Sequence, residues 1–192
     1  MFFRGFKSWC ENVAVQVRKE LALQPVDLLN PTLLAECLGV GIWTPKQIPG
    51  LDEKSLRILL KEDADSWSAV TLSVRSKDLI IVNSSHSKAR QASDLTHELS
   101  HILIGHEPGR VDISEDGLLI LNTYNRTQED EANWLAGCLL LPRELLVLIR
   151  RQQVDLKVAA KKYGVSSDMM RFRLNVTGVD RQFQYLQKSP IS

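Results

Sequence analysis

The first quarter of the chain combines helical hydrophobic spacing with turn residues. Apolar side chains recur every three or four positions between residues 6 and 23, at Phe6, Trp9, Val13, Val17 and Leu21. This spacing predicts an amphipathic helix, which Pro25 ends. Asn30 and Pro31 are residue types that cap and open a helix, so a second helix is expected over 32–38. A short strand is expected at 40–43, and the segment 51–60 favours a helix.

The pattern then changes to that of a sheet followed by a helix. Residues 66–74 are rich in Trp, Val, Thr and Leu, and residues 78–83 form a second strand-like run. The segment 75–77 between them is short enough for a hairpin turn. Residues 88–104 return to helical spacing. An α+β fold is therefore expected, with a small antiparallel sheet packed on this helix.

The second half of the chain is predicted to be mainly helical. The segment 118–121 is expected to form either a short strand or a packed loop. A helix is predicted over 128–140, with Thr127 as its cap and Asp130 completing an approximate capping box, and it stops at Pro142. Another helix is expected over 144–151. Residues 154–174 have the pattern of a helix–turn–helix around Gly164.

The helix predicted at 88–104 carries an H-E-x-x-H motif at His97, Glu98 and His101. Residues four apart lie on one helix face, so both imidazoles can reach one metal ion. Glu98 is then placed to act on a metal-bound water. The bare motif also occurs on ordinary helix surfaces. Other residues of the chain are therefore needed to distinguish a metal site from an ordinary helix surface.

A catalytic zinc site needs a third protein ligand, and Glu129 is the preferred candidate. It lies on a separate predicted helix, and Asn133 one turn later resembles the residue that orients a ligand histidine in glutamate-type zinc peptidases. Glu131 is the alternative ligand, and it points about 200° away around the helix. A third interpretation is that these acids only stabilise a helix N-terminus.

Three other side chains near the motif could contribute to a site. His106 follows His101 by five residues and lies past Gly105, off the shared face, so it is assigned to the surroundings of the ligands or to the surface. His86 lies in a polar loop and is interpreted as having no role in the site. Tyr124 is a candidate for stabilising an oxyanion, although nothing in the sequence places it there.

Composition and charge narrow the class of protein. The 192 residues are 44% hydrophobic and 24% charged, which suits one globular domain over 1–192. A net charge of +1 gives no argument for nucleic acid. No apolar run is long enough to span a membrane, and the N-terminus lacks the pattern of a signal peptide. Cys10, Cys37 and Cys138 form no C-x-x-C pair, so they are predicted to be buried, reduced thiols of a cytoplasmic protein.

Two separated motifs, in this order, resemble those of the ImmA/IrrE family of metallopeptidases. The first is the H-E-L-S-H segment at 97–101. The second is the E-D-E-A-N-W-L-A segment at 129–136, followed by L-L-L-P at 139–142. The resemblance covers about residues 66–179, including the helix-turn-helix-like tail. It departs from the family pattern only where Leu135 and Leu141 replace the usual phenylalanine and methionine.

The resemblance implies a zincin-like fold of the gluzincin type. It divides the domain into an N-terminal helical segment (6–50), a catalytic core (66–142) and a helix-turn-helix-like tail (143–180). It also implies zinc, with manganese as the alternative metal, held by His97, His101 and Glu129. Glu98 would be the general base, and Asn133 would orient a ligand histidine.

The family also implies a biological role. Its members are bacterial and often carried on mobile elements, and the best known cleave a helix-turn-helix repressor to relieve repression. The expected function is therefore zinc-dependent hydrolysis of a specific protein partner, and the resemblance implies that this partner is a helix-turn-helix transcriptional repressor. Glu98 would take a proton from the attacking water during this hydrolysis.

Two functions without catalysis remain as alternatives. Residues 143–173 contain eight basic and three acidic side chains, a net charge of +5, so the tail could bind DNA phosphates through Arg171 and Arg173. Packing of these helices onto the core is the preferred interpretation, and no DNA-binding residue is assigned. In the other alternative, the fold serves recognition in a toxin–antitoxin-like pair and the metal is structural.

Overall fold

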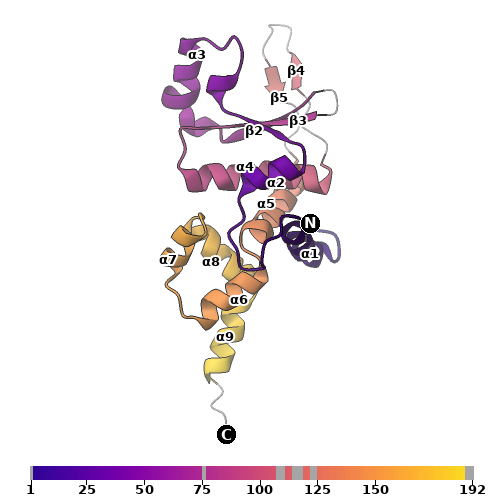
Figure 1. Cartoon of the computed structure of the whole chain (residues 1–192), viewed down its shortest axis with the longest axis vertical. Helices are drawn as coiled ribbons and strands as arrows, with labels where there is room; N and C mark the ends of the chain where they lie inside the picture. The colour runs from indigo at the N-terminus through magenta and orange to yellow at the C-terminus, as the bar shows by residue number, and fades with distance from the viewer. Residues whose placement is uncertain (1, 75–76, 107–110, 114–118, 122–124, 189–192) are drawn as a thin grey trace.

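A mixed three-stranded sheet lies above helix α4 (Lys88–Ile104) in Figure 1. The computed structural model describes residues 2–74, 77–106, 111–113, 119–121 and 125–188. The strands follow the order β1-β3-β2, with bounds β1 (Gly41–Trp43), β2 (Ala69–Val74) and β3 (Lys77–Val82). β2 and β3 form the predicted antiparallel hairpin, and β1 pairs with β3 in parallel. β2 is therefore an edge strand of this sheet.

Helix α4 has the bounds that the sequence predicts, because both of its ends are capped. The Ser87 hydroxyl accepts a hydrogen bond from the N–H of Arg90 at the start. Gly105 adopts a left-handed φ of 78° at the end, a conformation that glycine reaches without steric cost. Leu95 and Leu99 of this helix are buried in the core that includes Ile80 of β3.

Three further helices complete the upper core: α1 (Phe6–Glu20), α2 (Pro31–Cys37) and α5 (Arg126–Leu140). Asn30 caps α2 as predicted. Helix α5 is capped by Asn125, whose Oδ1 accepts hydrogen bonds from the N–H groups of Thr127 and Gln128. The predicted cap at Thr127 is therefore wrong, because the chain leaves its extended conformation at Asn125 and Thr127 already lies in the first turn.

Short elements connect the strands and helices of the upper half. They are η1 (Pro45–Gln47), α3 (Glu53–Arg57), the π-helical turn η2 (Ile58–Glu62) and η3 (Ala64–Ser66). The helix predicted over 51–60 thus corresponds to α3 and the start of η2. A separate two-stranded sheet pairs β4 (Val111–Ile113) with β5 (Leu119–Leu121), which places a strand within the segment 118–121.

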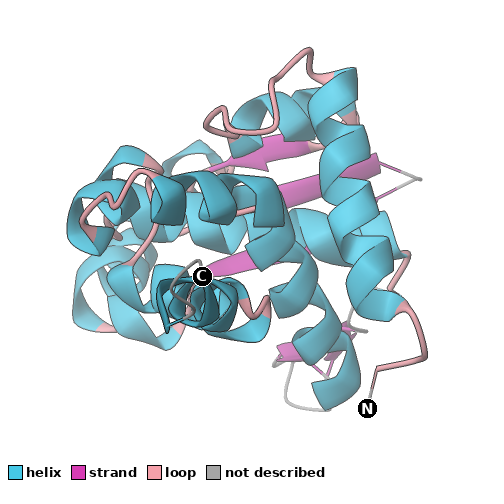
Figure 2. Cartoon of the chain, turned by 90° about the horizontal axis from the view of Figure 1, so that it is seen from below, coloured by secondary structure: helices cyan, strands magenta, loops and turns pink. Residues whose placement is uncertain are grey.

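Four helices form the lower part of the molecule, and Figure 2 shows them from below with the strands behind them. They are α6 (Arg143–Arg151), α7 (Leu156–Lys162), α8 (Ser167–Val176) and α9 (Val179–Lys188). Helices α7 and α8 form the predicted helix–turn–helix, with Gly164 at a φ of 63° between them. Helix α9 was not predicted; it packs against α6 and α8.

The buried apolar side chains form two clusters that divide within α5. The upper cluster includes Leu135 and Leu139 together with residues of α1, α4 and the sheet. The lower cluster begins at Leu140 and continues through helices α6 to α9. Consecutive leucines of one helix therefore belong to different cores, so α5 connects the two halves of the chain.

The sequence predicts that the three cysteines are buried and that no segment spans a membrane. Cys10 and Cys138 are buried and Cys37 is exposed, so the prediction of burial is wrong for Cys37; all three are free thiols. Within the part of the chain that the structure describes, no single helix is both long and apolar enough to cross a membrane. Helices α5 and α6 together have the length and apolar composition of a membrane span, but they meet at a bend of 50°.

Candidate metal centre

His97 and His101 project from one face of α4, and Glu129 approaches them from the first turn of α5. The two Nε2 atoms lie 3.1 Å apart. Glu129 Oε2 lies 3.1 Å from His97 Nε2, and its Oε1 lies 3.5 Å from His101 Nε2. One donor atom from each residue thus falls within 4.8 Å of the other two. The structure therefore brings together the three residues that the sequence predicts as ligands.

The spacing of these donor atoms fits a metal ion. Ligands at about 2.0–2.1 Å from a tetrahedral zinc ion lie roughly 3.3 Å from each other, and the distances here are 3.1–3.5 Å. Lone pairs of two imidazoles and a carboxylate repel at such distances unless a cation or protons lie between them. Burial, followed by the neighbouring His97 and His106, lowers the pKa of His101 to about 4, so its imidazole is neutral and free to bind a metal at pH 7.

Asn133 lies behind one of the histidines, one helical turn after Glu129. Its Oδ1 is 3.1 Å from Nδ1 of His97, whose Nε2 faces Glu129. An amide oxygen can only accept, so this contact places the imidazole proton on Nδ1 and leaves the Nε2 lone pair facing the other donors. The structure thus places Asn133 where the sequence expects it, in contact with a histidine of the donor set.

Glu98 is held by a residue that the sequence analysis did not single out. The hydroxyl of Thr71, on the edge strand β2, donates a short hydrogen bond to Glu98 Oε2. Burial raises the pKa of Glu98 above its ordinary value, opposed by this hydrogen bond and by the charge of His97. No sequence signal marks Thr71, because its contact with α4 depends on how the sheet lies across the helix.

Glu131, the alternative third ligand, does not join the donor set. Its Oε2 lies 3.1 Å from Nε2 of His106, and Nδ1 of His106 lies 2.9 Å from Nδ1 of His101. Glu129 therefore contacts His97 and His101, whereas Glu131 contacts His106. The structure places His106 behind His101 rather than among the three donor atoms. Tyr124, the candidate oxyanion residue, lies outside the described residues.

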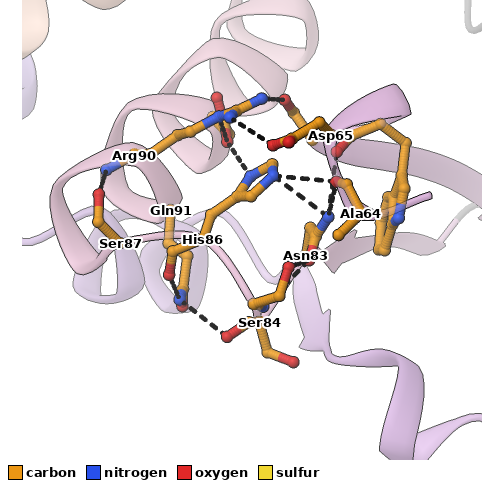
Figure 3. Close-up of polar contacts among 12 residues, drawn as sticks. Ala64, Asp65, Asn83, Ser84, His86, Ser87, Arg90 and Gln91 are labelled. Carbon is orange, nitrogen blue, oxygen red and sulfur yellow. Dashed lines mark hydrogen bonds and ion pairs between the residues drawn. The ribbon is translucent and has the colours of Figure 1, made fainter. Parts of the chain in front are cut away.

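His86 belongs to a separate polar network at the start of α4 (Figure 3). Its Nε2 lies 3.1 Å from the carbonyl oxygen of Ala64, and its Nδ1 lies 3.5 Å from Asp94 Oδ2. The amide of the buried Asn83 donates to the same carbonyl at 2.8 Å. Gln91 of α4 donates to the His86 carbonyl at 2.6 Å. This network ties the β3–α4 loop to η3 and so helps to fix where the motif-bearing helix begins.

An apolar cavity adjoins the candidate centre on the side of α8. It has a volume of about 570 Å³ and shares Asn133 with the surroundings of His97. Its apolar lining comes from the N-terminus and from helices α5 and α8, namely Phe2, Trp134, Met169 and Phe172. Asp130 and Asp168 add carboxylates to the lining. Asn133 is thus the residue that connects this cavity with the surroundings of His97.

The two arginines considered for DNA binding differ in exposure. Arg173 is fully buried and forms an ion pair with Glu11, so it cannot reach a phosphate in this fold. Arg171 is exposed and pairs with Asp168 of the same helix. Of the two, only Arg171 is available at the surface, and helix α8 packs against α5, α7 and α9. These contacts agree with the interpretation of the tail as a packed part of the fold.

The arrangement defines a class of protein. An H-E-x-x-H helix beneath a small sheet, with a glutamate from the next long helix beside its histidines, is the zincin-like arrangement of metallopeptidases. A family model, described as the IrrE N-terminal-like domain of Peptidase M78, matches residues 55–175. The chain belongs to this metallopeptidase family, in agreement with the resemblance seen in its motifs.

A comparison with solved structures gives a similar fold. The chain resembles a Mycobacterium tuberculosis transcriptional regulator with a TM-score of 0.53 and 15% sequence identity. The match covers 90% of this chain and 47% of that protein, so the chain spans about half of the regulator's length. At this identity the likeness shows a shared fold alone. No curated protein matches the chain.

Proposed function

We propose that this protein is a zinc-dependent peptidase in which His97, His101 and Glu129 hold the metal and Glu98 is the general base. The observation that carries the proposal is the convergence of the three donor atoms, at spacings of 3.1–3.5 Å, beside the half-buried carboxylate of Glu98. Two imidazoles and one carboxylate suit zinc, whereas manganese prefers sites richer in oxygen. Manganese is the alternative metal.

The chain's own residues account for the proton transfers. Bound zinc supplies Lewis acidity, which lowers the pKa of a water molecule and polarises a carbonyl group. Glu98 removes a proton from the attacking water and delivers it to the peptide nitrogen as the C–N bond breaks. Its raised pKa suits both transfers, because it brings the carboxyl closer to neutral pH. The Thr71 hydroxyl holds one carboxylate oxygen and so orients the other.

We further propose that the substrate is a protein in the bacterial cytoplasm, and specifically a helix-turn-helix repressor. Support for a polypeptide comes from the edge strand β2, which carries Thr71 and can pair with an extended segment. Support for a repressor comes from the family to which the chain belongs.

The first experiment measures metal content in four purified proteins. About one zinc per chain is expected in the wild type, in Glu98→Gln and in Asp130→Ala, and loss of zinc is expected in Glu129→Ala. Asp130 is a matched control, since it is the next residue of α5 and is exposed. Retention of zinc by Glu129→Ala would refute the ligand assignment.

The second experiment tests hydrolysis. Bacterial cells that express the wild type or Glu98→Gln are compared by labelling all new protein N-termini. Cleavage products that occur with the wild type and are missing with Glu98→Gln support the peptidase and identify its substrate. Identical N-termini in both strains, with zinc bound in both proteins, would instead favour a regulator in which the fold serves recognition.

A further inference from the structure

A line of three side chains runs outward from the metal centre through His101. Nδ1 of His101 lies 2.9 Å from Nδ1 of His106, and Nε2 of His106 lies 3.1 Å from Oε2 of Glu131. The side chains of His106 and Glu131 are only 6% and 15% exposed. Two largely buried polar side chains are thus lined up behind one histidine of the donor set.

The contacts in this line allow one consistent arrangement of protons when a metal is bound. The Nε2 atom of His101 faces His97 and Glu129, so its lone pair is the one available to a metal. A neutral imidazole carries one proton, which must then lie on Nδ1 and be donated to Nδ1 of His106. His106 must therefore carry its own proton on Nε2, where the Glu131 carboxylate accepts it.

We propose that His106 and Glu131 are positioning residues that hold His101 in its metal-binding tautomer and orientation. The inference rests on the proposed metal centre. Asn133 makes the equivalent contact to His97 with a single amide group. Both ligand histidines would then be held from behind by hydrogen-bond acceptors, an arrangement that raises the affinity of histidine sites for metals.

The end of helix α4 places His106 in this line. The N–H of His106 donates to the carbonyl of His101 at 3.0 Å, and the N–H of Gly105 donates to that of Ile102 at 3.1 Å. This pair of bonds around a left-handed glycine reverses the chain and returns residue 106 to the last turn of the helix. The Gly105–His106 sequence thus brings the second imidazole behind the first.

The line also gives different roles to the two glutamates of the E-D-E-A-N segment. Residues two apart on a helix project about 200° apart around its axis, so Glu129 and Glu131 cannot both contact the same metal-binding atoms. Glu129 faces both Nε2 atoms of the histidine pair, whereas Glu131 contacts His106. The first glutamate therefore belongs to the donor set and the second to its support.

The test measures zinc affinity by competition with a chromogenic chelator. His106→Phe and Glu131→Leu remove the acceptors, and each is expected to weaken zinc binding by about 10–100-fold. His106→Asn keeps an acceptor oxygen near the position of Nδ1, and Glu131→Gln keeps one for His106. Both of these variants are expected to bind zinc nearly as tightly as the wild type. The absorption spectrum of bound Co²⁺ is expected to change only in the first two variants.

The pairs of variants separate positioning from folding. Circular dichroism and thermal unfolding of the metal-free proteins identify any variant that fails to fold. If His106→Phe or Glu131→Leu does not fold, the zinc affinities of His106→Asn and Glu131→Gln are compared with that of the wild type instead. Wild-type affinity in His106→Phe would overturn the proposal, as would an equal loss in His106→Asn and His106→Phe. A wild type that binds no zinc, or Glu129→Ala that binds it normally, would instead refute the metal centre itself.

Discussion

Arg173 Nη2 lies 2.6 Å from Glu11 Oε1, and this ion pair joins helix α8 to helix α1. The arginine is fully buried, and its Nε and Nη2 also contact the carbonyl oxygen of Leu141 at 3.2 and 3.1 Å. Its side chain passes over Gly137 of α5, where an added Cβ would lie 2.8 Å from the arginine Cδ. One side chain of the tail thus fixes three helices of the fold, including the helix that carries Glu129.

Arg173→Ala is expected to destabilise the protein by about 3 kcal/mol, because it leaves the Leu141 carbonyl without its partner and leaves Glu11 with the Arg143 N–H but no cation. Arg171→Ala is the matched control. Arg171 is exposed and pairs with Asp168 on its own helix, so its removal should cost less than about 1 kcal/mol. Urea unfolding of the three proteins measures both values. Equal losses in the two variants would contradict the structural role of Arg173.

Gly137→Ala tests the close passage of Arg173 over α5. Alanine within a helix is usually more favourable than glycine by about 1 kcal/mol, but here its methyl group would displace the arginine stem. The substitution is expected to destabilise the wild type and to stabilise the Arg173→Ala variant. A double-mutant cycle on unfolding free energies measures this reversal. An additive cycle would show that the two residues do not interact.

Much of the region around the candidate centre could be predicted from the sequence. Helix α4 was predicted with its observed bounds from helical spacing, and the structure adds that Ser87 caps its start and Gly105 ends it. The i to i+4 spacing also predicted that His97 and His101 share a face. Local rules suffice here, since each of these features depends on residues close together in the chain.

Features that depend on packing between distant segments were harder to predict. Thr71 meets Glu98 only because β2 lies across α4, and Glu131 meets His106 only because α5 packs beside the end of α4. Helix α9 is short, with ten residues, and is supported by α6 and α8 rather than by strong local signals. Sequence spacing alone holds no information on such contacts.

Thr71→Val is expected to slow peptide hydrolysis by roughly tenfold, which corresponds to the loss of about one hydrogen bond to the general base. Valine has nearly the same shape as threonine, so zinc content and stability should change little. Thr71→Ser retains the hydroxyl and should restore most of the rate. The measurement is the initial rate of cleavage of the substrate that the N-terminal labelling identifies. Equal rates in the valine and serine variants would argue against this orienting contact.

The pKa of His101 predicts how the metal-free protein responds to acid. Its pKa falls from 6.5 to about 4 in the folded protein, chiefly because the imidazole is buried. Between these values the unfolded chain takes up a proton that the folded protein does not. The unfolding free energy should therefore decrease as the pH falls from 6.5 to about 4, by up to about 3 kcal/mol, with no contribution above that range.

Glu98 changes the unfolding free energy with pH in the opposite direction to His101, so the experiment is done in proteins that carry Glu98→Gln. Its pKa is raised above 4.5 in the folded protein, so the folded protein binds a proton more tightly than the unfolded chain. Through this residue, the unfolding free energy therefore increases as the pH is lowered toward 4.5. The comparison is therefore made between metal-free Glu98→Gln and Glu98→Gln/His101→Gln, by urea unfolding at pH 7.5 and pH 4.5. The first protein should lose more stability than the second, since only it retains the buried imidazole. Parallel losses in both proteins would show that His101 does not titrate as its burial indicates.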